Sequence, residues 1–476
     1  MISFFSALVL LVVGYLTYGR VVERLFGIAD NPTPAITQND GVDFVPMATW
    51  RAFLVELLDI AGTGPIFGAL MGAVFGPIVF LWIVFGSILG GAVHDFCAGM
   101  LSVRNGGKTI AEITGIYLGK TMLWVMRVFI VVLLVLVGTV FVTSPAQLFC
   151  MLTPADEPLI LWVAIILAYY LVATVVPIDK IIGRVYPIFG AILILMAVLV
   201  TVGLFVGGYS ISEIDFVNHH AQGLPVWPFM FITVACGAIS GFHATQAPLI
   251  SRCIKSERNG RCVFYGAMIA EGVIALVWAA AGVGFYENSA ALQASLTALG
   301  QSGTVYEISV GLLGSVGGVL AIIGVAICPI TSGDTAFRSA RLTLADCIGL
   351  DQVKYRNRFL IAIPMFVIAA ILSQLDFNVI WRYFSWSNQT LAMLVLWVAS
   401  VFLWRYGKNR WAFLITAVPA TFMSAVTSTY ILMASEGFGL SASIAYPCGF
   451  AFALLCVLLY IVNCKRHCRT TNHQRS

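Results

Sequence analysis

Charged side chains are scarce in this sequence. Asp, Glu, Lys and Arg make up 10% of its 476 residues, whereas hydrophobic residues make up 60% and the mean hydropathy is +0.95. Soluble domains carry about 25% charged residues, so a water-soluble fold is excluded. Apolar stretches of about 20 residues, the length that crosses a bilayer as a helix, recur along the chain. The sequence therefore predicts an all-α membrane protein.

Closely paired cysteines and long basic tracts are also lacking. The 11 cysteines are scattered without the CxxC spacing of zinc or redox sites, and most are expected to be packing residues. Cys464, His467, Cys468 and His473 stand at irregular spacing in a basic tail, so no metal site is assigned there. No cofactor and no nucleic-acid partner are expected. The sequence allows a homo-oligomer without requiring one.

The apolar runs divide the chain into membrane spans. The first run has no basic n-region and no small-residue cleavage site after it, so it is interpreted as a retained span rather than a signal peptide. About 13 transmembrane helices are predicted, near residues 2–19, 51–75, 77–103, 122–144, 158–177, 184–206, 225–252, 260–285, 305–337, 358–374, 379–404, 411–434 and 443–463.

The distribution of basic residues predicts the orientation. With the N-terminus outside and the C-terminus cytoplasmic, nearly all of the 26 Lys and Arg residues fall in cytoplasmic loops, as the positive-inside rule requires. Arg127 then lies just inside a span, and Arg382 stands alone near the outer side. The basic residues assigned to the inner side are Arg20, Arg24, Arg104, Lys108, Lys180, Arg184, those of 252–261, 338–358 and 405–410, and the tail from Lys465.

Two spans are interrupted in a similar manner. Ala61–Pro65 breaks the second span and Gly237–Pro248 breaks the seventh, and each break ends in Pro, which suits the first turn of a new helix. Two breaks five spans apart are typical of an inverted-repeat transporter. The alternative is that Gly and Pro are simply common in membrane helices.

The breaks also predict a domain plan. Residues 1–50 form an N-terminal span and a cytoplasmic loop, and 51–206 form the first five-helix repeat. Residues 207–404 form the second repeat, and 405–476 hold two C-terminal spans and the basic tail. The core is thus flanked by one extra N-terminal and two extra C-terminal helices.

Unwound backbone is tolerated inside a membrane only where it is buried in protein or lines a cavity, so the two breaks are expected to face each other across a substrate site. Half-helices beginning near Pro65 and His243 would point unpaired N–H groups at it, which favours an anion. No Lys or Arg is predicted at mid-membrane to pair with a carboxylate. The predicted substrate-binding residues are Gly62, Thr63, Gly64, Ser240, Gly241, His243, Thr245 and Gln246.

Several titratable residues are candidates for carrying a coupling proton. Histidine is the side chain that ordinarily changes charge near neutral pH, which makes His243 a candidate, although a hydrogen-bonded structural role is open. Asp95, beside His94, is costly in an apolar helix unless paired or protonated, and an interfacial salt bridge is the alternative. Glu56 and Asp59 share a helix face, as a proton site or as the lining of an aqueous inner vestibule. Glu271 in the eighth span is a further candidate.

The segment Cys328–Arg341 ends the ninth span with clustered oxygens. Hydroxyl, carbonyl and carboxylate oxygens are the ligands that hard cations prefer. Thr331, Ser332 and Asp334 are therefore candidates for a sodium site with carbonyls of the first break. The alternative is a helix end ordered by an Asp334 to Arg338 ion pair.

These motifs resemble the carbon starvation protein A family of bacterial inner-membrane transporters. The resemblance implies a multi-pass inner-membrane protein with a broken-helix core of the LeuT/APC type, linked to uptake of peptides and pyruvate when preferred carbon runs out. The matching segments are Asn31–Ala35, Asn39–Pro46, Ile60–Pro65, Gly91–Phe96, Gly237–Pro248 and Pro329–Asp346.

The chain departs from the family pattern in two respects. It is much shorter than the longest members and resembles the compact branch. Just before the first break, where members often carry a Gly-His-His type sequence, it has Val55–Asp59, so a His-based feature is not carried over.

The leading hypothesis is a secondary active symporter that imports a small carboxylate, pyruvate or a short peptide, with a proton or sodium gradient. A membrane channel and a non-transporting nutrient sensor are the alternatives. An enzyme is not favoured, because no nucleophile and base stand at a diagnostic spacing.

Overall fold

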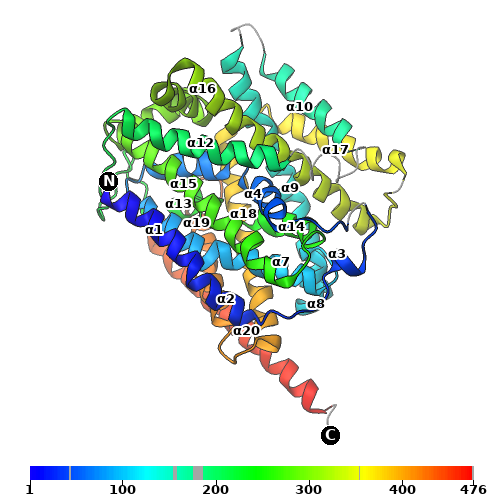
Figure 1. Cartoon of the computed structure of the whole chain (residues 1–476). Coiled ribbons are helices and arrows are strands. Elements are labelled where there is room, and N and C mark those ends of the chain that lie inside the picture. The colour runs from blue at the N-terminus through cyan, green and yellow to red at the C-terminus, as the bar shows by residue number, and fades with distance from the viewer. Residues whose placement is uncertain (42–43, 154–157, 175–185, 353, 474–476) are drawn as a thin grey trace.

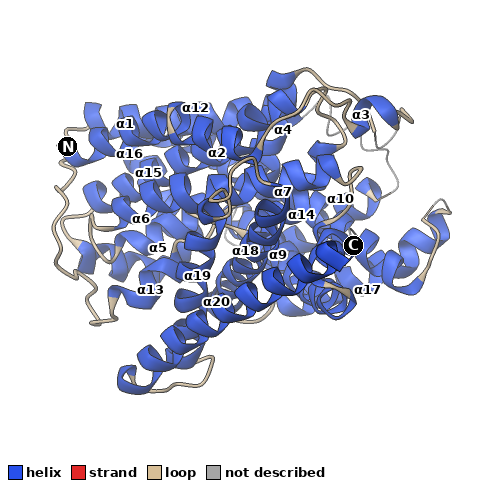
Figure 2. Cartoon of the chain, turned by 90° about the horizontal axis from the view of Figure 1, so that it is seen from below, coloured by secondary structure: helices blue, strands red, loops and turns tan. Residues whose placement is uncertain are grey.

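The computed structural model describes residues 1–41, 44–153, 158–174, 186–352 and 354–473. Helices make up the regular structure, and no strand occurs within these ranges (Figure 2). The all-α prediction is confirmed. Lys180 and Arg184 lie outside the described residues, as do the side chains of His467, Cys468 and His473.

Most helices follow one another with short connections, whereas residues 38–48 and 207–225 form longer ones (Figure 1). Their bounds are α1 (Ile2–Leu16), α2 (Tyr18–Phe26), α3 (Pro34–Thr37), α4 (Thr49–Ala61), η1 (Gly64–Gly68), α5 (Ala69–Ala73), α6 (Val79–Phe85), η2 (Gly86–Gly91), α7 (Ala92–Arg104), α8 (Ile110–Leu118), α9 (Lys120–Leu152), α10 (Leu159–Ala173), α12 (Tyr186–Val206), α13 (Val226–Thr233), α14 (Gly241–Ser251), η3 (Glu257–Asn259), η4 (Arg261–Tyr265), α15 (Gly266–Phe285), α16 (Ser289–Ile348), α17 (Tyr355–Leu372), α18 (Phe377–Tyr406), α19 (Leu414–Met433) and α20 (Ala442–His473).

Ten helices in the described ranges are long and apolar enough to cross a membrane, and the bent pair α4 and α5 makes an eleventh. Two more predicted spans correspond to shorter elements, namely α10 with 15 residues and the interrupted pair α13 and α14. The count of 13 therefore stays a prediction. One element is longer than any predicted span: α16 runs for 60 residues and is kinked at Gly300 and Gly314.

The bundle has interior and peripheral helices. The apolar window of α18 and that of the α6 to α7 segment are each 83% buried, and that of η4 and α15 is 78% buried. By contrast, the windows of α1 with α2 and of α20 are only 28% and 22% buried. Exposed apolar residues cover these peripheral helices, which is expected where a helix faces lipid. The first and last helices thus flank a core built around α4, α7, α14, α15 and α18.

Ion pairs join the loops at one end of the bundle. Arg104, at the end of α7, lies 3.0 Å from Glu257 and donates to the carbonyl of Gly27 at 2.6 Å. In the same region Arg258 pairs with Asp30 at 2.6 Å. These contacts gather three loops predicted to be cytoplasmic on one side of the molecule. Which side of the membrane this end faces stays a prediction.

Candidate functional site

The first predicted break is present between α4 and η1. The two helical segments meet at 57°, and Gly62 at the junction has a φ of +46°, a conformation that favours glycine. A Cβ atom on Gly62 would also lie 2.3 Å from the ring of Phe141 on α9. Glycine is required here for both its backbone freedom and its small size.

The second break is shorter than predicted. The backbone leaves the helix after Thr233 and α14 begins at Gly241, so the segment from Phe242 to Pro248 is helical. The half-helix begins two residues before His243, in agreement with the prediction that it begins near that residue. The prediction that Pro248 opens it is wrong, because Pro248 lies inside α14, where membrane helices tolerate it.

The two breaks lie against each other. A Cβ atom on Gly64 would stand 2.2 Å from the Cβ atom of Cys236, and one on Gly237 would stand 3.6 Å from the Cα atom of Pro65. A side chain at Gly64 would therefore separate the breaks. The expectation that the two interruptions share one region agrees with this packing.

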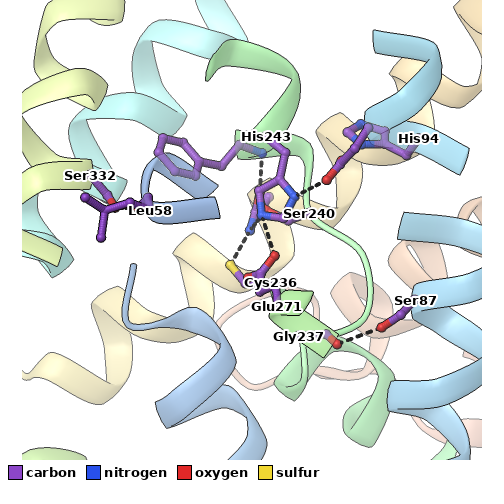
Figure 3. Close-up of polar contacts among 12 residues, drawn as sticks. Leu58, Ser87, His94, Cys236, Gly237, Ser240, His243, Glu271 and Ser332 are labelled. Carbon is purple, nitrogen blue, oxygen red and sulfur yellow. Dashed lines mark hydrogen bonds and ion pairs between the residues drawn. The ribbon is translucent and has the colours of Figure 1, made fainter. Parts of the chain in front are cut away.

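Side chains from neighbouring helices satisfy the backbone of the second break. Asn388 on α18 accepts from the N–H of Phe242 at 2.6 Å and from the hydroxyl of Ser240 at 3.2 Å. Ser87 donates to the carbonyl of Gly237 at 3.1 Å (Figure 3). Asn388 explains why α14 starts at Gly241, since its side chain caps the new helix. The Phe242 amide is thus already occupied, contrary to the expectation that the amides of this half-helix are unpaired.

Asn388 was not among the site residues predicted from the sequence. A signal was present, because Asn and Gln at 388 and 389 interrupt an apolar span, and polar residues in membrane helices mark functional or packing contacts. Gln389 donates to the carbonyl of Phe231 at 2.6 Å. The pair holds both sides of the second break.

Four titratable side chains meet beside the second break (Figure 3). Asp95 on α7 has Oδ1 at 2.7 Å from His94 Nδ1 and Oδ2 at 2.8 Å from His243 Nδ1. The other ring nitrogen of His243 lies 3.4 Å from Glu271 on α15, an ion-pair separation longer than a hydrogen bond. All four residues are fully buried. Asp95 is thus paired inside the bundle, not in the interfacial salt bridge that was its alternative.

Glu56 and Asp59 on α4 are also fully buried. None of their carboxyl oxygens has a hydrogen-bond partner among the described residues. The Glu56 side chain interacts electrostatically with Asp95 and Asp59. The Asp59 side chain interacts electrostatically with Asp334 and Arg338. Both carboxyl groups are therefore enclosed by protein in this structure, and their role as a proton site or as the lining of a vestibule stays a prediction.

The clustered oxygens of α16 lie against the end of α4. Ser332 donates to the carbonyl of Leu58 at 2.9 Å, and Thr331 donates to the carbonyl of Cys328 at 2.8 Å. The Leu58 carbonyl belongs to the last turn of α4, where helix carbonyls lack intrahelical partners. Ser332 is therefore near a backbone oxygen of α4 and Thr331 near one of its own helix, whereas the sodium-site hypothesis expected carbonyls of the first break, so this site stays a prediction.

Asp334 has the partners that its alternative role requires. Its carboxylate lies 3.8 Å from Arg338 and accepts from Tyr186 at 3.4 Å. Arg338 also donates to the carbonyl of Ala173 at 2.9 Å. Because α16 continues to Ile348, Asp334 and Arg338 lie inside this helix, and their pair does not order a helix end as the alternative expected.

The remaining predicted residues are buried near the breaks. Thr245 donates to the Phe242 carbonyl at 2.7 Å, and Gln246 donates to Thr245 at 2.8 Å. The hydroxyl of Thr63 and the side-chain carbonyl of Gln246 have no partner in the described part of the chain. These two polar atoms are free to contact a bound solute. No group of three or more His, Cys, Asp or Glu side chains suited to a metal ion occurs among the described residues.

Solved structures share this fold. A single-residue mutant of a manganese transporter from Eremococcus coleocola superposes with a TM-score of 0.59 at 13% identity, over 90% of this chain and 99% of that one. MhsT in complex with L-phenylalanine gives 0.56 at 13% identity, over 87% and 98%. Such low identity shows the fold alone, which is that of LeuT-fold transporters.

Sequence comparisons identify relatives. An "Uncharacterized membrane protein" of Haemophilus influenzae is 44% identical over 63% of this chain and 95% of its own length. The "Peptide transporter CstA" of Campylobacter jejuni is 26% identical over 89% and 78%. The "Pyruvate/proton symporter BtsT" of Escherichia coli is 26% identical over 52% and 43%.

The profile of the family described as "Carbon starvation protein CstA" matches residues 1–158, 146–304 and 285–430. These segments cover most of the chain, including both breaks and the buried acidic residues. The chain therefore belongs to the carbon starvation protein CstA family.

Proposed function

We propose that this protein is a secondary active transporter that imports a small carboxylate, pyruvate or a short peptide, by alternating access coupled to a proton gradient. The relatives named above as a peptide transporter and as a pyruvate/proton symporter support the substrate class. The substrate carboxylate binds beside the two breaks, where the hydroxyl of Thr63 is free to donate to it.

The buried carboxyl groups of the core support the coupling of transport to a cation gradient. Five carboxyl groups are buried in the core, at Glu56, Asp59, Asp95, Glu271 and Asp334. The only arginine in ion-pair contact with any of them among the described residues is Arg338, and two histidines complete the set. Ionised carboxylates cost several kcal/mol each when buried without a partner. The core must therefore take up protons or bind cations.

The geometry favours the proton. His243 bridges Asp95 and Glu271, so its two ring nitrogens can exchange protons with a carboxyl group on either side. At the alternative sodium site, the hydroxyl of Ser332 and the carbonyl of Leu58 already bond to each other. A sodium ion would have to break that bond to enter.

Alternating access is supported by an asymmetry of cavities. A cavity of about 510 Å³ opens at the end of the bundle predicted to be outside, between α5, α13 and α18. At the opposite end, a cavity of about 40 Å³ lies beside Thr245, Arg252 and Ser339. The smaller cavity admits little more than a water molecule, which supports a conformation more open toward the predicted outside.

Uptake into proteoliposomes tests the proposal. Labelled pyruvate and a labelled dipeptide are offered with an inward proton gradient, an inward sodium gradient or neither, to wild type, Asp95→Asn and the exposed control Asp30→Asn. Accumulation by wild type and by the control with the proton gradient, and its loss in Asp95→Asn, is the expected result. Absence of accumulation of either solute under every gradient would refute it. Unitary currents in a planar bilayer would instead indicate a channel.

A further inference from the structure

The large outer cavity contains one isolated pair of opposite charges. Arg382 on α18 contacts Glu436, which follows α19, and the two side chains are 42% and 10% exposed. Arg382 is the basic residue predicted to stand alone on the outer side. The other titratable residues of the lining are His220 and Tyr430. Burial lowers the pKa of His220, and a tyrosine is neutral at pH 7, so neither adds a charge at neutral pH. The cavity thus presents one cation and one anion.

Buried polar groups without partners line the same cavity. The indole N–H of Trp381 and the hydroxyl of Ser385 have no hydrogen-bond partner among the described residues, and each residue is 1% exposed. Such groups are costly to leave unpaired. They lie on α18, one helical turn from each other and beside Arg382. A ligand bound at Arg382 can accept from both.

The floor of the cavity touches the first break. The ring of Trp381 packs on Phe67 of η1 with centroids 5.9 Å apart. A Cβ atom on Gly68 would lie 3.7 Å from the Trp381 indole. A ligand that contacts Trp381 is therefore one side chain away from the broken helix, and can affect its position.

We propose that the outer cavity is a recognition site for short zwitterionic peptides. The peptide carboxylate binds Arg382, with Trp381 and Ser385 as further donors, and the peptide ammonium binds Glu436. The ligand thereby exchanges the Arg382 to Glu436 pair for two new ion pairs, so no charge is left uncompensated. This inference rests on the proposed function and selects the peptide from its two substrate classes.

The size and charge of the cavity favour a peptide over pyruvate. A volume of about 510 Å³ lies in the range of about 300–1,000 Å³ that holds ligands much larger than a three-carbon acid. Pyruvate has no ammonium group, so its binding to Arg382 would leave the Glu436 carboxylate without a positively charged partner. Unpaired charges at a partly buried site weaken binding.

Binding of matched ligands to detergent-purified full-length protein tests the site without requiring transport. The probes are Ala-Ala, N-acetyl-Ala-Ala without the ammonium, Ala-Ala-amide without the carboxylate, and pyruvate, and the readout is Trp fluorescence or thermal stabilisation. Each blocked peptide is expected to bind wild type about tenfold or more weakly than Ala-Ala, since each loses a charge-assisted contact. Pyruvate is expected to bind still more weakly.

Two substitutions assign the two ends of the ligand. Glu436→Gln is expected to abolish the preference for Ala-Ala over the acetylated peptide but to keep the preference over the amide. Arg382→Gln is expected to show the reverse pattern. Arg258→Gln, an exposed arginine among the loops at the opposite end, is the control and retains both preferences. The double charge reversal Arg382→Glu with Glu436→Arg guards against loss of folding, since it keeps the ion pair.

Equal binding of all three peptides by wild type, or unchanged preferences in both variants, overturns the inference. Pyruvate uptake by a wild-type protein that binds no peptide also overturns it, and leaves the proposed function intact. Peptide binding with the predicted preferences but no uptake under any gradient supports the site and refutes the proposed function.

Discussion

Gly64 and Cys236 touch across the two helix breaks: a Cβ atom on Gly64 would stand 2.2 Å from the Cβ atom of Cys236. Neither residue is close to the other in sequence, and each lies where its span loses helical geometry. This contact fixes the distance between the two unwound segments. The packing of the breaks is therefore a property that single substitutions can test.

Gly64→Ala is expected to destabilise the protein by about 1–3 kcal/mol, because the added methyl group overlaps Cys236. Cys236→Gly removes the opposing Cβ atom, so the double variant is expected to recover much of the lost stability. Thermal unfolding in detergent measures both. Equal destabilisation by Gly64→Ala in the two backgrounds would contradict the contact.

Asp95→Asn and His243→Ala are each expected to weaken gradient-driven uptake strongly while the folded protein stays in the membrane. Asparagine keeps the shape of Asp95 and can still bond to the histidines, but it cannot carry a proton. Solute exchange without net proton movement should survive better in Asp95→Asn than accumulation does. If both purified variants accumulated the solute to the same level as the wild-type protein, Asp95 and His243 would have only a packing role.

Asn388→Ala is expected to lower the free energy of unfolding by about 1–3 kcal/mol, because the backbone N–H of Phe242 and the hydroxyl of Ser240 would be left unpaired in the core. Asn409→Ala is the matched control, since Asn409 accepts from the Trp411 N–H on the exposed surface. Unfolding temperatures that differ little between the two variants would show that Asn388 does not hold the second break.

The loop after α12 is expected to loosen in acid. His219 donates to the carboxylate of Asp215 at 2.9 Å, and this hydrogen bond lowers the pKa of Asp215. A lowered pKa in the folded state stabilises the loop above the ordinary value of about 3.9, and this contribution is lost as the pH falls below it. Proteolysis of the loop by an acid-active protease should therefore increase in that range, and Asp215→Asn should remove the pH dependence.

Hydropathy and glycine patterns predicted much of the architecture. The first break was located from Gly62, Gly64 and Pro65 because positive φ and a missing N–H leave a clear mark on local sequence. The second was drawn too long, since Pro248 is a weaker signal inside a membrane, where helices tolerate it. The actual start of α14 depends on Asn388, a tertiary contact 146 residues away in the chain.

The candidate site, too, could be predicted from the sequence only in part. Burial of Asp95, Glu56 and Glu271 followed from their positions in apolar spans. The pairing of Asp95 with His243 required α7 to pack on α14, which periodicity does not encode. The ion pair of Arg382 with Glu436 likewise depends on how α18 packs on α19. The sequence shows both charges but not their contact.

Proton movement during solute uptake tests the central claim most directly. Pyruvate or Ala-Ala is added to proteoliposomes that carry no imposed gradient, while a dye reports the external pH. Proton-coupled import predicts that the external medium becomes alkaline with wild type and Asp30→Asn, in sodium-free buffer, and stays unchanged with Asp95→Asn. Solute entry without any alkalinisation, or entry that occurs only with sodium, would contradict the account.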